Sequence, residues 1–168
     1  YLALPRVSSE RRAFIPIAYA DTDLIAGDKL QTIPNASLFE FGVITSSMHM
    51  AWMRTTAGRL KSDFQYSAKI TYNNFPWPEQ TEKHIHNIKA AAQAILDARI
   101  EHINASLADL YDPLTMPNNL LKAHQALDKA VDTAYGYKGA QTDATRVAFL
   151  FDLYQKITSI LPAEFKKK

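Results

Sequence analysis

A tryptophan held between two prolines, Pro76-Trp77-Pro78, constrains the fold of this chain more than any other part of the sequence. Proline lacks a backbone N–H and fixes φ, so neither a helix nor a central strand can run through this segment. The apolar pattern differs on its two sides. We therefore predict an α+β fold with a β-rich part at 1–80, a helical part at 81–168, and Trp77 substantially buried between them.

The part before the prolines combines short strands with one helix. β-branched and aromatic residues predict strands within 2–7, 12–20, 24–33 and 68–72, separated by Ser-, Asp- and Gly-rich turns. Ser37 with Glu40 three residues later is typical of a capping box, and the apolar residues that follow recur at helical spacing. We predict one continuous helix over 37–56 that ends before Gly58.

The part after the prolines is helical in pattern. Apolar residues at i, i+3 and i+4 predict helices over 81–104, 117–135 and 142–161, with a short turn at 107–111. Pro117 is placed where a first-turn proline is tolerated, and Gly136 where a C-cap is expected. Each helix has one polar face, which favours a small helical bundle.

Composition and motifs exclude several classes of function. The chain has no cysteine, which removes disulfides, thiolate nucleophiles and cysteine-ligated zinc. No apolar run reaches the roughly 18 residues that span a bilayer, so no membrane partner is expected. Glycine-rich cofactor loops, a P-loop, HExxH and GxSxG are all missing, and the histidines are not spaced to share a metal. We assign no catalytic residue, no cofactor and no metal to this chain.

Two further observations bear on the kind of partner. Residues 1–80 carry 8 Lys and Arg against 7 Asp and Glu, so bulk charge shows no basic surface, and any binding of nucleic acid must depend on local placement. The chain begins at Tyr1, without methionine and within a strand-like pattern. We expect it to be a fragment of a longer protein.

The segment 58–67 has the strongest local pattern for DNA reading. Lys61, Asp63 and Gln65 alternate with Ser62, Phe64 and Tyr66, so an extended backbone would place a donor, an acceptor and an amide on one face. Lysine can bind guanine, aspartate can accept from cytosine and glutamine can pair with adenine in the major groove. The same spacing also fits an exposed edge strand with ordinary charges, and spacing alone leaves both interpretations open.

Longer motifs give a resemblance to a known family. The β-rich part resembles the end of the target recognition domain of the MmeI-like restriction-modification enzymes, and the helical part resembles their C-terminal region. The motifs of the first part are 41–46, 48–54, 58–63, 66–67 and 72–78. Those of the second part are 91–99, 107–112, 116–117, 123–124, 127–128, 130–131 and 134–136. The resemblance covers nearly the whole chain.

The resemblance implies that pairs of residues read successive base pairs. The implied pairs are Lys61 with Asp63, Arg6 with Asp28, and Lys29 with Gln65. A cation with a carboxylate suits a G·C pair, and an acidic residue close to phosphates makes sense chiefly as a base reader. The candidate phosphate contacts are Arg11, Arg12, Arg54, Arg59 and Lys69, of which Arg54, at the end of its predicted helix, could equally be structural.

The resemblance also implies a parent enzyme larger than this chain. Double-stranded DNA and the upstream methyltransferase and helical domains would be its partners, S-adenosylmethionine and Mg²⁺ the cofactors of the parent, and the bacterial cytoplasm its location. A second hypothesis is a protein-interaction or scaffold module whose helical half docks on another domain. An independent methyltransferase would need a cofactor motif that this sequence lacks.

Overall fold

The computed structural model describes residues 1–159, and two small antiparallel sheets form its N-terminal region. The first sheet has the order β3-β1-β4, from β1 (Leu2–Pro5), β3 (Ala18–Tyr19) and β4 (Leu30–Ile33). The second has the order β2-β6-β5, from β2 (Val7–Ser8), β5 (Gly58–Leu60) and β6 (Asp63–Gln65). Arg6 is the single residue between β1 and β2, which belong to different sheets.

The predicted helix over 37–56 is two helices, α1 (Leu38–Thr45) and α2 (Ser47–Thr56). The capping box of Ser37 and Glu40 is present, as the sequence predicts. The continuous helix is wrong, because Ser46 is extended (φ −73°, ψ 159°). The backbone N–H and the hydroxyl of Ser47 donate to the Asp128 carboxylate at 2.7 and 2.6 Å, so the break fixes α2 to a helix 81 residues later.

The predicted strand over 68–72 is also wrong, because this segment is a single π-helical turn, η1 (Ala68–Tyr72). Its β-branched residues suggested a strand, but the Trp52 indole N–H donates to the carbonyl of Thr71 at 2.9 Å. The Asn74 amide donates to the carbonyls of Lys69 and Ile70. The side chains of Trp52 and Asn74 therefore bind backbone carbonyls that, in a strand, would accept hydrogen bonds from a neighbouring strand.

Up to residue 159, four helices follow the prolines: α3 (Glu82–Ile100), α4 (Leu107–Leu110), α5 (Asn118–Tyr135) and α6 (Asp143–Thr158). They agree with the three predicted helices, and the predicted short turn at 107–111 is the four-residue helix α4. Gly136 ends α5 in the left-handed region (φ 63°), which only glycine adopts at no cost. The predicted extension of the last helix to residue 161 lies outside the described residues. No helix within residues 1–159 is long and apolar enough to cross a bilayer.

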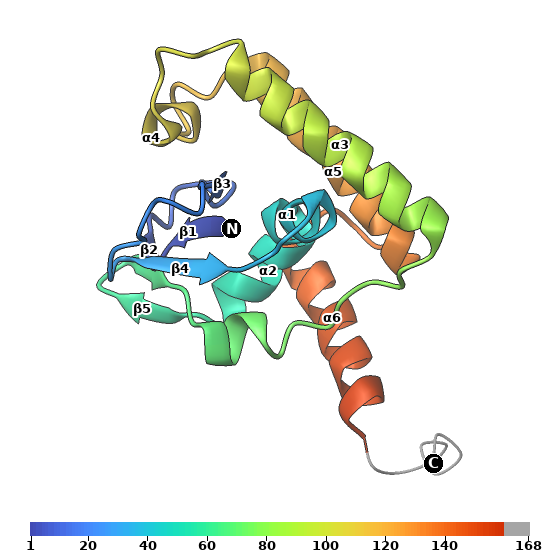
Figure 1. Ribbon diagram of the computed structural model, residues 1–168. Helices are drawn as coiled ribbons and strands as arrows, with labels where there is room; N and C mark the ends of the chain where they lie inside the picture. The colour runs from blue at the N-terminus through green and yellow to red at the C-terminus, as the bar shows by residue number, and fades with distance from the viewer. Residues whose placement is uncertain (160–168) are drawn as a thin grey trace, which may run out of the picture.

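The helices and the sheets share one hydrophobic core, so the fold is α+β. Figure 1 shows α1 and α2 between the sheets and the pair α3 and α5, with α6 running along α2. Gly42 of α1 faces Ile88 and Ala92 of α3 and Leu127 of α5, close enough that an added Cβ would lie 2.7 Å from Ile88. The Tyr135 hydroxyl donates to the carbonyl of Pro76 at 2.7 Å. Trp77 is half-buried and lies against the rings of Phe39, Tyr72 and Phe75, all in the part that precedes the prolines.

Candidate nucleic-acid interface

Three segments far apart in sequence meet at Arg6, and we call this meeting point the sheet junction, made of Arg6, Asp28, Lys29, Gln65 and Tyr66. The backbone N–H of Arg6 donates to the carbonyl of Lys29 at 2.9 Å, and its carbonyl accepts from the N–H of Tyr66 at 2.7 Å. The Arg6 guanidinium donates to the carbonyl of Asp28 at 3.1 Å. The structure therefore gathers four of the six predicted base readers, Arg6, Asp28, Lys29 and Gln65, and the side chains of all four are exposed.

A hollow of about 500 Å³ lies beside the sheet junction. Arg6 and Lys69 bring two cations to its lining, and Gln31 and Gln65 bring two amides. No carboxylate from the described part of the chain, residues 1–159, lines it. A concave surface with cations and amides together offers donors to phosphate oxygens and a donor and acceptor pair to a base edge.

Gln31 is a candidate that sequence reasoning missed. Gln31 of β4 pairs with Leu4 of β1, is half-buried and lines the hollow. Within residues 1–159 this amide makes no hydrogen bond to protein. The signal in the sequence was a polar residue at an inward-facing position of a strand, between Leu30 and Ile33, which apolar patterning does not explain.

The other two predicted readers, Lys61 and Asp63, lie at the tip of the hairpin that β5 and β6 form. The predicted row of Lys61, Asp63 and Gln65 on one extended face is wrong, because Lys61 is in the left-handed region (φ 57°) and belongs to the two-residue turn. Asp63 and Gln65 do share one face of β6, opposite the buried Phe64. The side chains of Lys61 and Asp63 have no ion pair or hydrogen bond within residues 1–159.

The hairpin tip itself is held by Arg59. Its guanidinium lies over the Phe64 ring, 3.8 Å from the centroid, and donates to the carbonyl of Ser62 at 2.7 Å. It also pairs with Glu10 at 3.5 Å. These contacts fix the turn that presents Lys61, although Arg59 stays exposed at its outer edge.

Arg54 holds the two halves together, which is the structural role that sequence reasoning left open. It forms an ion pair with Asp143 at 2.7 Å and donates to the carbonyls of Arg12 and Ala13. Its side chain is 27% exposed. Arg11 and Lys69 are exposed, and their side chains have no ion pair or hydrogen bond within residues 1–159, whereas Arg12 is half-buried.

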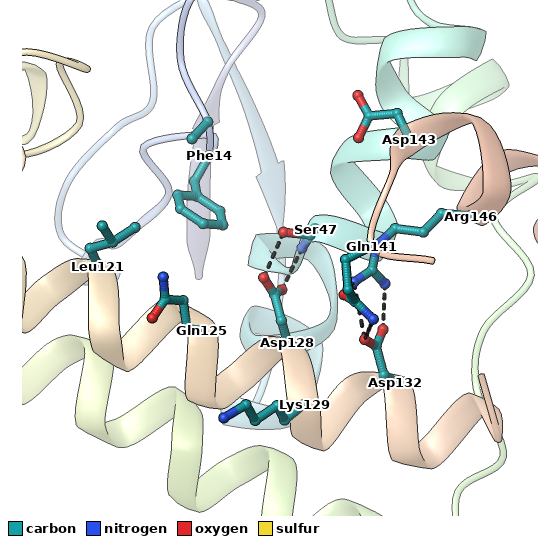
Figure 2. Close-up of a pocket in the computed structure, with 11 residues that line it drawn as sticks. Phe14, Ser47, Leu121, Gln125, Asp128, Lys129, Asp132, Gln141, Asp143 and Arg146 are labelled. Atoms are coloured by element: carbon teal, nitrogen blue, oxygen red, sulfur yellow. Dashed lines mark hydrogen bonds and ion pairs between the residues drawn. The ribbon is translucent and has the colours of Figure 1, made fainter. Parts of the chain in front are cut away.

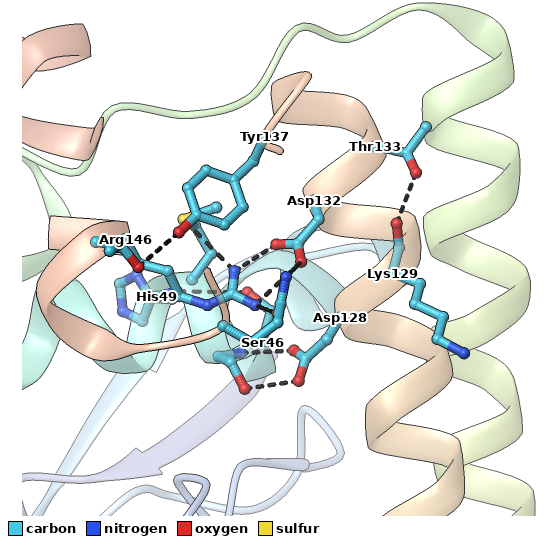
Figure 3. A network of polar contacts seen from close by, with 12 residues as sticks. Ser46, His49, Asp128, Lys129, Asp132, Thr133, Tyr137 and Arg146 are labelled. Carbon is cyan, nitrogen blue, oxygen red and sulfur yellow. Dashed lines mark hydrogen bonds and ion pairs between the residues drawn. The ribbon is translucent and has the colours of Figure 1, made fainter. Parts of the chain in front are cut away.

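A second hollow, of about 580 Å³, lies elsewhere, where α2, α5 and α6 meet (Figure 2). Its polar groups already bind one another: Asp128 accepts from Ser47, and Asp132 pairs with Arg146, which also donates to Gln141. Figure 3 shows that these contacts form one network across the three helices. Burial raises the pKa of the Asp128 carboxyl against the lowering effect of the Ser47 hydrogen bonds. This network joins helices, and it leaves few groups free for a ligand.

Two histidines that the sequence left as solvent-facing or core residues are in the core. His49 and His124 are fully buried, and burial lowers the pKa of each to about 3. His49 Nε2 is 2.9 Å from the Tyr66 hydroxyl, and His124 Nε2 is 2.8 Å from the Tyr111 hydroxyl. Within residues 1–159 no group of three or more acidic or histidine side chains could hold a metal ion.

Comparison with known proteins gives the family. The model of the MmeI target recognition domain matches residues 1–79, and that of the MmeI C-terminal domain matches residues 80–162. The chain belongs to the MmeI family. DNA methyltransferase A of Bacillus subtilis (strain 168) is 41% identical over 157 residues, which are 94% of this chain and 18% of that relative.

A solved structure supports the same relationship. The type IIL restriction-modification enzyme MmeI, in complex with DNA, is 52% identical with a TM-score of 0.93, over 95% of this chain and 21% of that one. The resemblance to the MmeI-like family is therefore confirmed over nearly the whole chain. The chain spans about a fifth of the length of the relatives that it matches.

Proposed function

We propose that this MmeI-family chain is the DNA-reading part of a larger bacterial restriction-modification enzyme, in which the sheet junction and the hairpin tip contact base edges in the major groove. The meeting of Arg6, Asp28, Lys29 and Gln65 at one exposed point carries the proposal. Arg6 and Gln65 lie 59 positions apart in the chain. They come together because Val7, the residue after Arg6, pairs with Gln65 between β2 and β6. Such a gathering of donors, acceptors and amides is what direct readout requires.

The free polar groups at the hairpin tip support the second contact. Lys61 is exposed and Asp63 is half-buried, and neither side chain is bound to another part of residues 1–159. Lysine would donate to guanine O6 and N7, and aspartate would accept from cytosine N4. We propose that this pair reads one G·C base pair.

Three of the predicted cations remain in the proposal as phosphate contacts. Arg11, Arg59 and Lys69 are exposed, and Lys69 lines the hollow beside the sheet junction. Arg59 also pairs with Glu10, but at 3.5 Å and with both side chains exposed. Arg12 is less suited because it is half-buried, and Arg54 is left out because it is only 27% exposed and is bound to Asp143 at 2.7 Å. The small number of free cations fits a chain whose parent enzyme would hold DNA with other domains as well.

The helical half is proposed to dock on another domain of the parent chain, such as its methyltransferase domain. Ile100, Ile103 and Leu114 are 68%, 83% and 92% exposed, all near the end of α3 and the segment after α4. Exposed apolar residues concentrated in one region are typical of an interaction surface. The same exposed apolar residues also support the scaffold hypothesis for the helical half. S-adenosylmethionine and Mg²⁺ are proposed to bind to other domains of the parent enzyme.

The test exchanges Lys61 and Asp63 in the full parent enzyme. In the double variant Lys61→Asp/Asp63→Lys, aspartate tolerates the left-handed backbone of position 61 well, so the turn should be retained. We expect the preferred base pair at one position of the site to change from G·C to C·G, with a discrimination of about tenfold to hundredfold. The measurement is methylation of a DNA library with each site position randomised in turn, read by sequencing.

Lys69→Ala provides the matched control, because it removes a free cation beside the same surface. It should weaken binding to all sequences alike and lower the salt dependence of affinity. Equal loss of methylation at every sequence in the Lys61 and Asp63 exchange, with the preferred base unchanged, would refute base reading by the hairpin tip.

A further inference from the structure

We propose that His49 and Tyr66 are positioning residues for base reading, and that their hydrogen bond holds the sheet junction at a fixed distance from α2. The proposal rests on the proposed function of the junction and adds two residues that do not themselves touch DNA. The sequence pattern gave neither a role in base reading, because one is a lone histidine on a buried helix and the other a buried residue directly after β6.

Tyr66 connects the exposed junction to the core through two different groups. Its backbone N–H donates to the carbonyl of Arg6 at 2.7 Å, and it follows the predicted reader Gln65 directly. Its side chain is 5% exposed, and its hydroxyl lies 2.9 Å from His49 Nε2. A shift of the Tyr66 ring is therefore transmitted to Arg6 and to Gln65.

His49 is held rigidly enough to serve as the fixed end of this contact. It lies in the first turn of α2, its backbone N–H donates to the Ser46 hydroxyl, and the Phe75 ring stands edge to face against it with centroids 4.5 Å apart. Trp52, three residues further along α2, donates its indole N–H to the carbonyl of Thr71 in η1. The imidazole has no freedom to follow a displaced tyrosine.

The direction of the hydrogen bond follows from counting unsatisfied atoms. His49 Nδ1 has no partner within residues 1–159. If His49 Nε2–H donated, the tyrosine O–H and the bare Nδ1 would both be unsatisfied in the core. If the tyrosine O–H donates to a bare Nε2, only Nδ1–H lacks a partner, so this arrangement is favoured. Removing the tyrosine hydroxyl therefore deprives a buried nitrogen of its donor.

Base reading depends on this geometry because hydrogen bonds to base edges tolerate little displacement. Donor and acceptor must stay within about 2.7 to 3.2 Å with good alignment. A binding constellation needs support that fixes it to about 0.5 Å. Arg6 lies between two short sheets, and its carbonyl accepts a hydrogen bond from Tyr66, which in turn contacts the helical core. We therefore expect the position of the junction readers to depend more strongly on Tyr66 than the position of the hairpin tip does.

The experiment compares Tyr66→Phe with Tyr135→Phe in the full parent enzyme. Both variants remove one buried tyrosine hydroxyl and its hydrogen bond, but the Tyr135 hydroxyl binds Pro76 between the two halves. Melting temperature and base preference at each randomised site position are measured for both. We expect similar losses in melting temperature, and a drop of about fivefold in base discrimination at the junction positions in Tyr66→Phe alone.

His49→Gln and His49→Leu give the complementary comparison. A glutamine amide can place an acceptor near the position of Nε2, so His49→Gln should keep more of the base discrimination than His49→Leu. Equal discrimination in Tyr66→Phe, Tyr135→Phe and the unmodified enzyme would overturn the positioning role. The Lys61 and Asp63 exchange is run in the same assay: if it shifts the preferred base while Tyr66→Phe changes nothing, the positioning role fails and the proposed function stands. If the exchange shifts nothing either, both fail.

Discussion

The two buried histidines predict that this chain loses stability in mild acid. Burial lowers the pKa of His49 to about 3, and burial with the nearby Arg99 charge lowers that of His124 to about 3, from an ordinary 6.5. The unfolded chain therefore binds these protons more tightly than the folded chain does. The free energy of unfolding that the two neutral histidines contribute is fully present above pH 6.5 and is lost as pH falls towards 3.

The magnitude follows from the width of that window. Below the pKa of the unfolded form, each histidine lowers the free energy of unfolding by about 1.4 kcal/mol for each unit that the pH falls. One histidine therefore lowers the free energy of unfolding by about 2 kcal/mol at pH 5 relative to pH 7.5. Two give about 4 kcal/mol, a large part of an ordinary folding free energy of about 5 to 15 kcal/mol. The raised pKa of Asp128 acts in the opposite direction.

The assay is urea unfolding followed by circular dichroism at pH 7.5, 6.5, 5.5 and 5.0 and constant ionic strength. His124→Gln should remove about half of the pH dependence, whatever its effect on stability at pH 7.5. His86→Gln, at an exposed position of α3, is the control for removing a histidine outside the core. A free energy of unfolding that is constant or rises between pH 7.5 and 5.0 would refute the reasoning.

Two further predictions concern the packing of α1 on α3 and the buried ion pair between α5 and α6. Gly42→Ala should destabilise the chain by about 1 kcal/mol: the helix gains about 1 kcal/mol from alanine, but the new Cβ would lie 2.7 Å from Ile88, and overpacking costs about 1 to 3 kcal/mol. A stabilised variant in urea unfolding would contradict this. Asp132→Asn leaves the buried Arg146 without its charge partner and should cost about 3 to 5 kcal/mol in the same assay. A loss below about 1 kcal/mol would mean that Arg146 is solvated.

Local signals determined much of the fold from the sequence. The capping box at Ser37, the left-handed Gly136 and the two prolines around Trp77 each act through a few neighbouring residues, and the structure has all three as the sequence predicts. The helices after the prolines follow from apolar spacing alone. These features are local because backbone conformation and helix capping depend on residues within about one turn.

Long-range contacts decided where the local pattern was misleading. The break at Ser46 exists because Asp128 binds Ser47 from 81 positions away, and η1 replaces a strand because Trp52 binds Thr71. Asp128 lies outside residues 37–56, and Trp52 lies outside residues 68–72, so neither segment contains the partner that decides its conformation. Side-chain hydrogen bonds from elsewhere can override weak local preferences, since each is comparable in free energy to the difference between the competing conformations.

The candidate site shows the same division. Residue types that read bases could be recognised in the sequence at Arg6, Lys61 and Asp63, together with the family that they resemble. Their arrangement could not: the gathering of three segments around Arg6 is made by backbone hydrogen bonds across two sheets, and the contact of Tyr66 with His49 is made inside the core. The sequence determines which chemical groups are present through composition and local spacing. Only the tertiary structure brings groups from distant segments within hydrogen-bonding distance, because sheet pairing and core packing act between residues that the sequence separates.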